Sequence, residues 1–343
     1  MNLYINGKWT GDKLDTFEVT NPATGEVVDT VPKGGKNEAE AAATAAHEAL
    51  PGWSALSAYE RSEKLEAWHR LIEEHTEELA QTMTKEQGKS IKESRGEIGY
   101  ANSFIKWYAE EGKRAYGETI PPVSADKRMY VIKQPVGVVA AITPWNFPAA
   151  MITRKVAPAL AVGCTTVIKP ASQTPLTALK LAELAERAEI PKGVINVVVG
   201  STSEISKAWQ EDKRVRKLTF TGSTEVGRML MSGAAETVKK ISLELGGHAP
   251  VIVFQDADIE RAVEDTIASK FRNGGQTCVC ANRIYVHESI ADEFTKKMKS
   301  AVKGLKVGNG LDEDTDIGPM IDEDAVEKVI AILTMQKIKG QRL

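Results

Sequence analysis

The stretch that organises this chain runs from Glu244 to Cys280. It begins Glu244-Leu-Gly-Gly-His248 and ends Phe271-Arg-Asn-Gly-Gly-Gln-Thr-Cys278-Val-Cys280. A thiolate is a strong nucleophile, and a nearby carboxylate can activate the water that releases an acyl group from it. Either residue taken alone is more simply a buried glutamate or a core cysteine. The two together, each beside glycines that let other groups approach the backbone closely, indicate covalent catalysis.

Before this stretch, β-branched apolar runs alternate with helical patterns. Strands are expected at residues 136–142, 165–168, 194–199, 215–220 and 240–245, and helices at residues 148–160, 175–188, 203–209 and 224–235. A second unit is expected to start near Gly246, with a strand at residues 250–254 and a helix from Asp258. This alternation predicts an α/β fold with a mainly parallel sheet, which binds ligands beyond the carboxyl ends of its strands.

The chain before residue 136 follows a different pattern. Asn6-Gly7 predicts a hairpin, and short strands are expected across residues 17–31. Helices are expected at residues 37–50, from residue 57 to about 87, and from about residue 90 to 116. Asn37 and Ser57 are interpreted as caps because each is followed three residues later by Glu, and the aromatic residues of the later helices as core. Residues 128–134 are expected to form a strand outside the main sheet.

Length and composition exclude several classes of protein. The chain has 343 residues, which favours two domains of about 150 residues each. Its net charge of -3 gives no support for a nucleic-acid or membrane partner, and no apolar run is long enough to span a bilayer. Three cysteines do not make a disulfide framework, and the N-terminus lacks the apolar core of a signal peptide. A cytoplasmic location is therefore expected.

Glu-Leu-Gly-Gly followed by Gly-Gln-Thr-Cys resembles the aldehyde dehydrogenase superfamily, and Pro144-Trp-Asn-Phe-Pro148 and Phe220-Thr-Gly-Ser223 match it as well. The resemblance extends from Met1 to about Val329 and is strongest to succinate-semialdehyde dehydrogenases. It implies a Rossmann-like parallel-sheet cofactor domain at residues 1–124 and 136–245 and a truncated α/β catalytic domain at residues 246–343. A bridging strand at residues 125–135 belongs to a small sheet, and full-length members are expected to form homo-oligomers.

The resemblance implies a mechanism for three residues. The Cys278 thiolate adds to an aldehyde, and the Asn146 amide holds the oxyanion together with a backbone N–H. Hydride passes to NAD or NADP, and Glu244 activates the water that hydrolyses the thioester. A simpler role for Asn146 is to cap the next helix. Glu244 argues against a CoA-acylating member, in which water must not compete for the thioester.

Cofactor residues are implied at three expected strand ends. Residues 221–227 open a helix, whose free N–H groups favour a phosphate, although Gly222 alone could mark a turn. Lys169 is implied to reach the adenosine ribose, although it could be simply an exposed lysine. Ser172 leaves room beside Lys169 for a 2′-phosphate, so NADP should be accepted. The full set is Thr143, Pro144, Trp145, Lys169, Ser172, Thr221, Gly222, Ser223, Gly227 and Leu245.

Two arginines are implied to bind the substrate. Arg154 lies in Met151-Ile-Thr-Arg-Lys155, and Arg272 lies six residues before Cys278. Either could be an ordinary surface arginine. Both match positions that hold the substrate carboxylate in succinate-semialdehyde dehydrogenases, where two guanidiniums bind that group with geometric specificity. The expected partner is therefore a small aldehyde that carries a carboxylate.

The remaining cysteines and His248 are given structural roles. No metal is expected, because no further Cys or His stands at ligand spacing from Cys278 and Cys280. Under oxidation this pair could close a strained disulfide, or Cys280 could be a small packing residue. Cys164 is expected in the core. His248 is interpreted as a structural histidine rather than as part of a cysteine hydrolase, which would act without a nicotinamide.

The sequence changes character after Ala331. Residues 332–343 contain Lys337, Lys339 and Arg342 and no acidic residue, and no Glu-x-Phe-Gly-Pro motif of the family occurs in the chain. A shift of reading frame is the hypothesis that this change suggests. The alternative function is then an inactive truncated remnant that at most binds nucleotide, with apolar sheet surface left uncovered. A turnover assay separates this alternative from an active enzyme.

Overall fold

The computed structural model describes residues 1–338, which form two compact units. The first unit comprises Met1–Val19, Asp29–Ala80 and Arg95–Leu245. The second comprises Thr20–Val28, Gln81–Ser94 and the chain from Gly246 onward. The first unit ends at Leu245, and the domain bounds expected from the sequence stay a prediction. The two short segments of the second unit carry no sequence signal that links them to the chain beyond Gly246.

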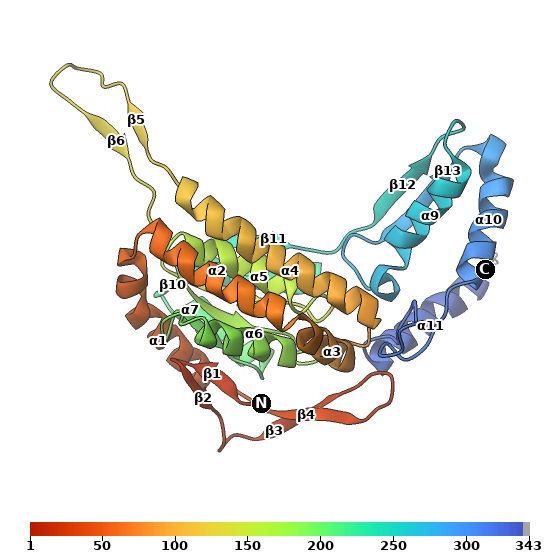
Figure 1. The fold of residues 1–343 in the computed structure, drawn as a ribbon, viewed down its shortest axis with the longest axis horizontal. Coiled ribbons are helices and arrows are strands. Elements are labelled where there is room, and N and C mark those ends of the chain that lie inside the picture. Colours follow the sequence, from red (N-terminus) through yellow and green to blue (C-terminus); the bar gives the residue numbers. More distant parts are fainter. Residues whose placement is uncertain (339–343) are drawn as a thin grey trace. The chain divides into compact units, whose positions relative to one another are not determined.

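A seven-stranded sheet forms the centre of the first unit (Figure 1). Its order is β11-β10-β7-β8-β9-β1-β2, with neighbours parallel from β11 to β9 and antiparallel from β9 to β2. The strands are β1 Leu3–Ile5, β2 Lys8–Thr10, β7 Val138–Ile142, β8 Thr165–Lys169, β9 Ile195–Val197, β10 Val215–Thr221 and β11 Lys240–Glu244. Every residue of β7 and β8 is buried, as expected for parallel strands covered on both faces. The predicted α/β fold is therefore confirmed.

The helices of this unit are joined by buried tryptophans. The helices that lie wholly in this unit are α1 Lys36–Ala55, α2 Ala58–Glu74, α5 Ala150–Ala161, α6 Leu176–Arg187, α7 Thr202–Glu211 and α8 Thr224–Ala235. Two further helices, α3 Thr76–Gln87 and α4 Ile91–Glu111, each have residues in both units. Trp53, Trp68 and Trp209 are buried, and each indole N–H donates to a backbone carbonyl of another helix. Burial of a Trp is favourable when its N–H finds such a partner. Trp107 is 63% exposed, so its interpretation as a core residue was wrong.

Local signals placed some helix starts correctly and missed others. Ser57 caps α2, and its hydroxyl and the Glu60 carboxylate each accept from the other residue's backbone N–H, as predicted. The cap predicted at Asn37 was wrong, because α1 begins at Lys36 and Glu38 accepts from the backbone N–H of Gly35 at 2.8 Å. The helix expected to reach about residue 87 is divided at His75 into α2 and α3.

Two further pairs of strands lie outside the seven-stranded sheet. β5 Glu118–Ile120 pairs with β6 Met129–Val131, and every residue of both strands is exposed; Figure 1 shows this ribbon projecting beyond the end of α4. β6 lies within the strand expected at residues 128–134. Its partner β5 was not predicted, because a strand with no buried face shows little alternation. β3 Thr16–Thr20 pairs with β4 Val27–Pro32, where short strands were expected.

The second unit is smaller. β12 Ala249–Val253 and β13 Ala281–Val286 pair in parallel. The helices that follow Gly246 are α9 Ile259–Lys270, α10 Ala291–Lys303 and α11 Glu323–Ile338. Val253, Val263 and Phe294 form its buried core. Ile252 and Phe254 are 60% and 66% exposed. Residues 339–343, the end of the basic segment described above, lie outside the described part of the chain.

Candidate active site

The parallel register brings four predicted residues to one edge of the sheet. Glu244 ends β11 and is the register partner of Thr221, which ends β10. Lys169 ends β8 beside Ile142 of β7, and the N–H of Thr143 donates to the Lys169 carbonyl at 3.0 Å. This is the carboxyl edge of the strands, where parallel sheets bind ligands.

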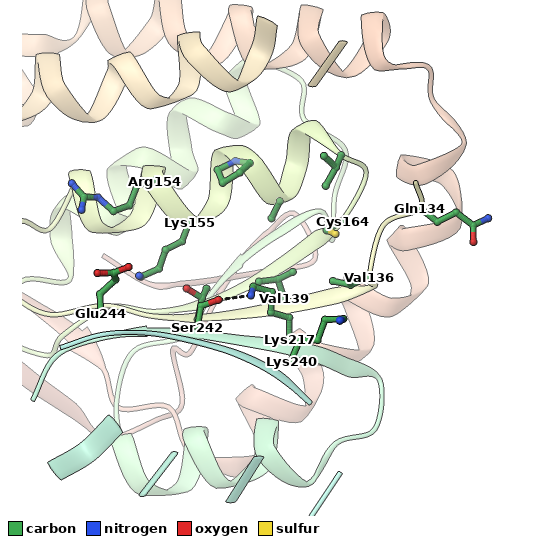
Figure 2. A pocket seen from close by; sticks show the side chains of 14 residues that line it. Gln134, Val136, Val139, Arg154, Lys155, Cys164, Lys217, Lys240, Ser242 and Glu244 are labelled. Atoms are coloured by element: carbon green, nitrogen blue, oxygen red, sulfur yellow. Dashed lines mark hydrogen bonds between the residues drawn. The ribbon is translucent and has the colours of Figure 1, made fainter. Parts of the chain in front are cut away.

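A lysine that the sequence reasoning did not select lies at this edge. Lys155 of α5 is 8% exposed, and its Nζ donates to the Thr221 hydroxyl at 2.6 Å. Figure 2 shows its side chain pointing towards the Glu244 carboxylate. Both residues line a cavity of about 550 Å³. Burial lowers the pKa of Lys155 to about 8, and the negative charge of Glu244 opposes that shift. The cavity therefore has a carboxylate and a readily deprotonated amine at one end.

Arg154 lines the same end of this cavity (Figure 2). Its Nη2 donates to the Tyr100 hydroxyl at 2.9 Å. The guanidinium carbon lies 5.5 Å from the Tyr100 ring centre and 4.9 Å from that of Phe104, within cation–π range. Aromatic residues of α4 thus fix the guanidinium in one position.

Asn146 lies in the loop between β7 and α5. The helix begins at Ala150 with Ala149 as its N-cap, so Asn146 is not the cap that the simpler interpretation required. The buried carboxylate of Glu97 caps the helix instead, accepting from the N–H groups of Ala149 and Ala150 at 3.0 and 3.2 Å. A role for Asn146 other than capping is therefore open.

The predicted cofactor segment after β10 has the geometry of an anion site. α8 begins at Thr224, and its N-cap Ser223 accepts from the N–H of Val226, so the first turn presents the remaining N–H groups. A Cβ at Gly227 would lie 2.6 Å from the end of the Leu245 side chain, so a larger residue there would displace that side chain. A Cβ at Gly222 would lie 2.4 Å from the end of the Phe220 ring, so that ring would have to move.

The segments after β7 and β8 offer further polar groups. Lys169 is 3% exposed, donates to the Pro170 carbonyl at 3.1 Å, and has its pKa lowered to about 8 by burial. The Thr143 hydroxyl is buried without a hydrogen-bond partner among the described residues. Pro144 and Trp145, which follow Thr143, and Ser172, which lies three residues after Lys169, are half-buried. A helix N-terminus, a buried cation and an orphaned hydroxyl at one sheet edge fit a dinucleotide.

Residues 271–280, which we call the nucleophile loop after the predicted role of Cys278, belong to the second unit. Arg272 begins the turn Arg272–Gly275, and half-buried Cys278 follows it. The Gln276 side chain holds the loop, donating to the Asn273 carbonyl and accepting from the N–H of Ile321, both at 3.1 Å. The structure thus places Cys278 and Arg272 on one loop, and Glu244, Lys155 and Arg154 around one cavity of the first unit.

The remaining residues of interest have the following surroundings. Cys164 and Cys280 are buried and free, and the ring of His248 contacts the Asn282 amide at 3.2 Å. Within residues 1–338, no three His, Cys, Asp or Glu side chains gather where they could hold a metal ion. No helix in this range is long and apolar enough to cross a membrane.

Sequence reasoning missed Lys155, Tyr100 and Glu97. A signal existed for Lys155, since it is four residues from both Met151 and Ala159 and therefore on the apolar face of a buried helix. No local signal identifies Tyr100 or Glu97, because their partners on α5 lie about fifty residues away in the sequence.

Known proteins resemble this chain closely. A model of the aldehyde dehydrogenase family matches residues 9–343. A glutarate-semialdehyde dehydrogenase of Pseudomonas putida KT2440 is 61% identical over 327 residues, covering 95% of this chain and 68% of the relative. The NADP(+) succinate-semialdehyde dehydrogenase GabD of Escherichia coli K12 is 57% identical over 340 residues, covering 99% of this chain and 70% of the relative. A crystal structure described as an E. coli NADP-dependent enzyme is 57% identical with a TM-score of 0.97, covering 99% of this chain and 71% of that one.

The chain belongs to the aldehyde dehydrogenase family. By family it is an oxidoreductase that acts on aldehydes with NAD or NADP, and the predicted resemblance and fold are confirmed.

Proposed function

We propose that this chain oxidises a short aldehyde that carries a carboxylate at its other end, with succinate semialdehyde as the favoured substrate. The supporting observation is that Arg154 and Glu244 both line one end of a single cavity. A guanidinium whose position is fixed by two rings suits a carboxylate, and Glu244 suits the activation of water. The relatives named above are, by name, dehydrogenases of the semialdehydes of glutarate and succinate.

The proposed chemistry uses three residues in sequence. The Cys278 thiolate adds to the aldehyde carbon, and the Asn146 amide donates to the oxygen that becomes negative. NAD or NADP supplies the acceptor for the hydride that leaves this carbon. A thioester on Cys278 remains, and Glu244 takes a proton from the water that hydrolyses it. Lys155, in the same cavity as Glu244, offers a group through which that proton can leave.

The cofactor is proposed to lie along the carboxyl edge of the sheet. The first turn of α8, from Ser223 to Gly227, would hold phosphate. Lys169 and Ser172 would face the adenosine ribose. Residue 172 is a serine and not an acidic residue, so it would not repel a 2′-phosphate. Acceptance of both NAD and NADP follows from that absence of charge.

The test separates the two half-reactions. Cys278→Ala should abolish aldehyde oxidation while fluorescence titration still detects bound NADPH. Glu244→Gln should release one equivalent of reduced cofactor in a burst and then stall, because hydride transfer precedes thioester hydrolysis. A Glu244→Gln protein that turns over at the normal steady rate contradicts the proposal. An unaltered chain that reduces no cofactor with any aldehyde supports the alternative of an inactive remnant.

A further inference from the structure

A lysine side chain lies against the second cysteine of the nucleophile loop. The Nζ of Lys270, the last residue of α9, is 3.5 Å from the sulfur of Cys280. The thiol in turn lies 3.5 Å from the Lys270 carbonyl oxygen. The intervening loop folds back so that both ends of the lysine residue contact one sulfur atom.

Neighbouring groups hold this pair in place. The Lys270 Nζ also donates to the Asn282 side-chain oxygen at 2.8 Å. Gly275 has a φ of +80°, and a Cβ there would lie 3.2 Å from the Lys270 carbonyl and 3.9 Å from the Cys280 sulfur. Cys280 is 2% exposed. The lysine therefore approaches the sulfur within a packed cluster rather than as a free surface side chain.

We propose that Lys270 and Cys280 form a covalent nitrogen–sulfur cross-link when the protein meets hydrogen peroxide. The Cys280 thiol first reduces one peroxide, giving a sulfenic acid and one water. The Lys270 amine then attacks this sulfur, the S–N bond forms, and the sulfenic hydroxyl leaves as water with a proton from the amine. One peroxide is consumed, two waters are released, and the product has two hydrogen atoms fewer than the thiol and amine together.

The main competing product is a disulfide between Cys280 and Cys278. Sulfenic acids condense with thiols as well as with nitrogen. A disulfide between residues two apart requires a strained ring, whereas the Lys270 nitrogen already lies in contact with the sulfur. The cross-link also leaves Cys278 as a free thiol, so it is independent of the proposed catalytic function.

Tryptic mapping distinguishes the two products. Cleavage at Arg261, Lys270, Arg272 and Arg283 yields residues 262–270 and residues 273–283, and the second peptide contains both cysteines. A disulfide leaves residues 273–283 as one peptide that is two hydrogen atoms lighter. The cross-link blocks cleavage at Lys270 and joins residues 262–272 to residues 273–283. We expect this joined pair after peroxide treatment.

Matched variants make the assignment specific. Cys278→Ser removes the disulfide partner and should keep the joined pair, whereas Lys270→Arg and Cys280→Ser should each abolish it. Added thiol should release the two peptides. Circular dichroism melting establishes that each variant is folded before oxidation. A folded Cys278→Ser protein that gives only sulfinic or sulfonic acid at Cys280, with Lys270 cleaved normally, overturns the proposal.

Discussion

The backbone N–H of Asn273 donates a 2.6 Å hydrogen bond to the Glu93 carboxylate. Asn273 has a φ of 51°, and Gly274 and Gly275 follow at 62° and 80°. Three consecutive residues thus adopt a left-handed conformation, which costs free energy at the non-glycine position. Glu93 stabilises the turn at that position. It lies in the segment Gln81–Ser94, which belongs to the same unit as the nucleophile loop.

Removing the Glu93 carboxylate should disturb the nucleophile. A hydrogen bond to a charged group contributes roughly 1.5–3 kcal/mol, so Glu93→Ala should lower kcat by about 10- to 100-fold if the whole loss reaches the reacting geometry. Glu93→Gln keeps an acceptor oxygen and should recover most of the activity. Steady-state kinetics with melting curves measures both effects. Equal losses of kcat in the two variants would show that this hydrogen bond does not position Cys278.

The contact between Tyr100 and Arg154 should affect charged substrates selectively. Tyr100→Phe retains the ring beside the guanidinium but removes the hydroxyl that accepts from Nη2. Its KM for succinate semialdehyde should rise several-fold, consistent with a net loss of about 1 kcal/mol, while a neutral aldehyde of similar length is unaffected. Arg154→Ala should raise the same KM further. Tyr59→Phe, at a tyrosine that is 67% exposed, is the control. A KM that rises equally for both aldehydes would refute the role in carboxylate binding.

Burial of Lys155 should make stability depend on pH. Its pKa is about 8 in the folded chain and 10.5 as an ordinary lysine, so between these values the unfolded chain binds more protons. Stability therefore rises with pH across this window, by at most about 1.4 kcal/mol per pH unit. Lys155→Met removes this contribution. The free energy of unfolding of Lys155→Met minus that of the unaltered protein should be largest near pH 8 and should decrease towards about pH 10.

Urea unfolding at several pH values measures this difference. Lys169 has the same lowered pKa and is present in both proteins, so its contribution cancels in the comparison. Lys155→Met also loses the hydrogen bond to Thr221. That loss changes the difference in unfolding free energy by the same amount at every pH, so it does not produce a dependence on pH. A difference that stays constant with pH would mean that Lys155 is not neutralised by burial.

Short-range patterns in the sequence determined the order of the elements. The alternation of strands and helices from residue 136 onward, the hairpin at Asn6-Gly7 and the cap at Ser57 all agree with the structure. These features depend on side-chain period and turn geometry over a few residues, which the sequence displays directly. The Glu244 and Cys278 motifs were found for the same reason, because each is a contiguous run of residues.

Only the tertiary structure decided which distant groups meet. Lys155 lies beside Glu244 because it donates to Thr221 of β10, and Thr221 is the parallel register partner of Glu244 in β11. Glu97 caps α5 and Tyr100 holds Arg154 because α4 lies against that helix. Lys270 contacts Cys280 because the intervening loop turns back through left-handed glycines. Such contacts join residues ten to about ninety positions apart, and packing of the whole unit fixes them, because no local period or turn signal specifies which side chains approach across the fold.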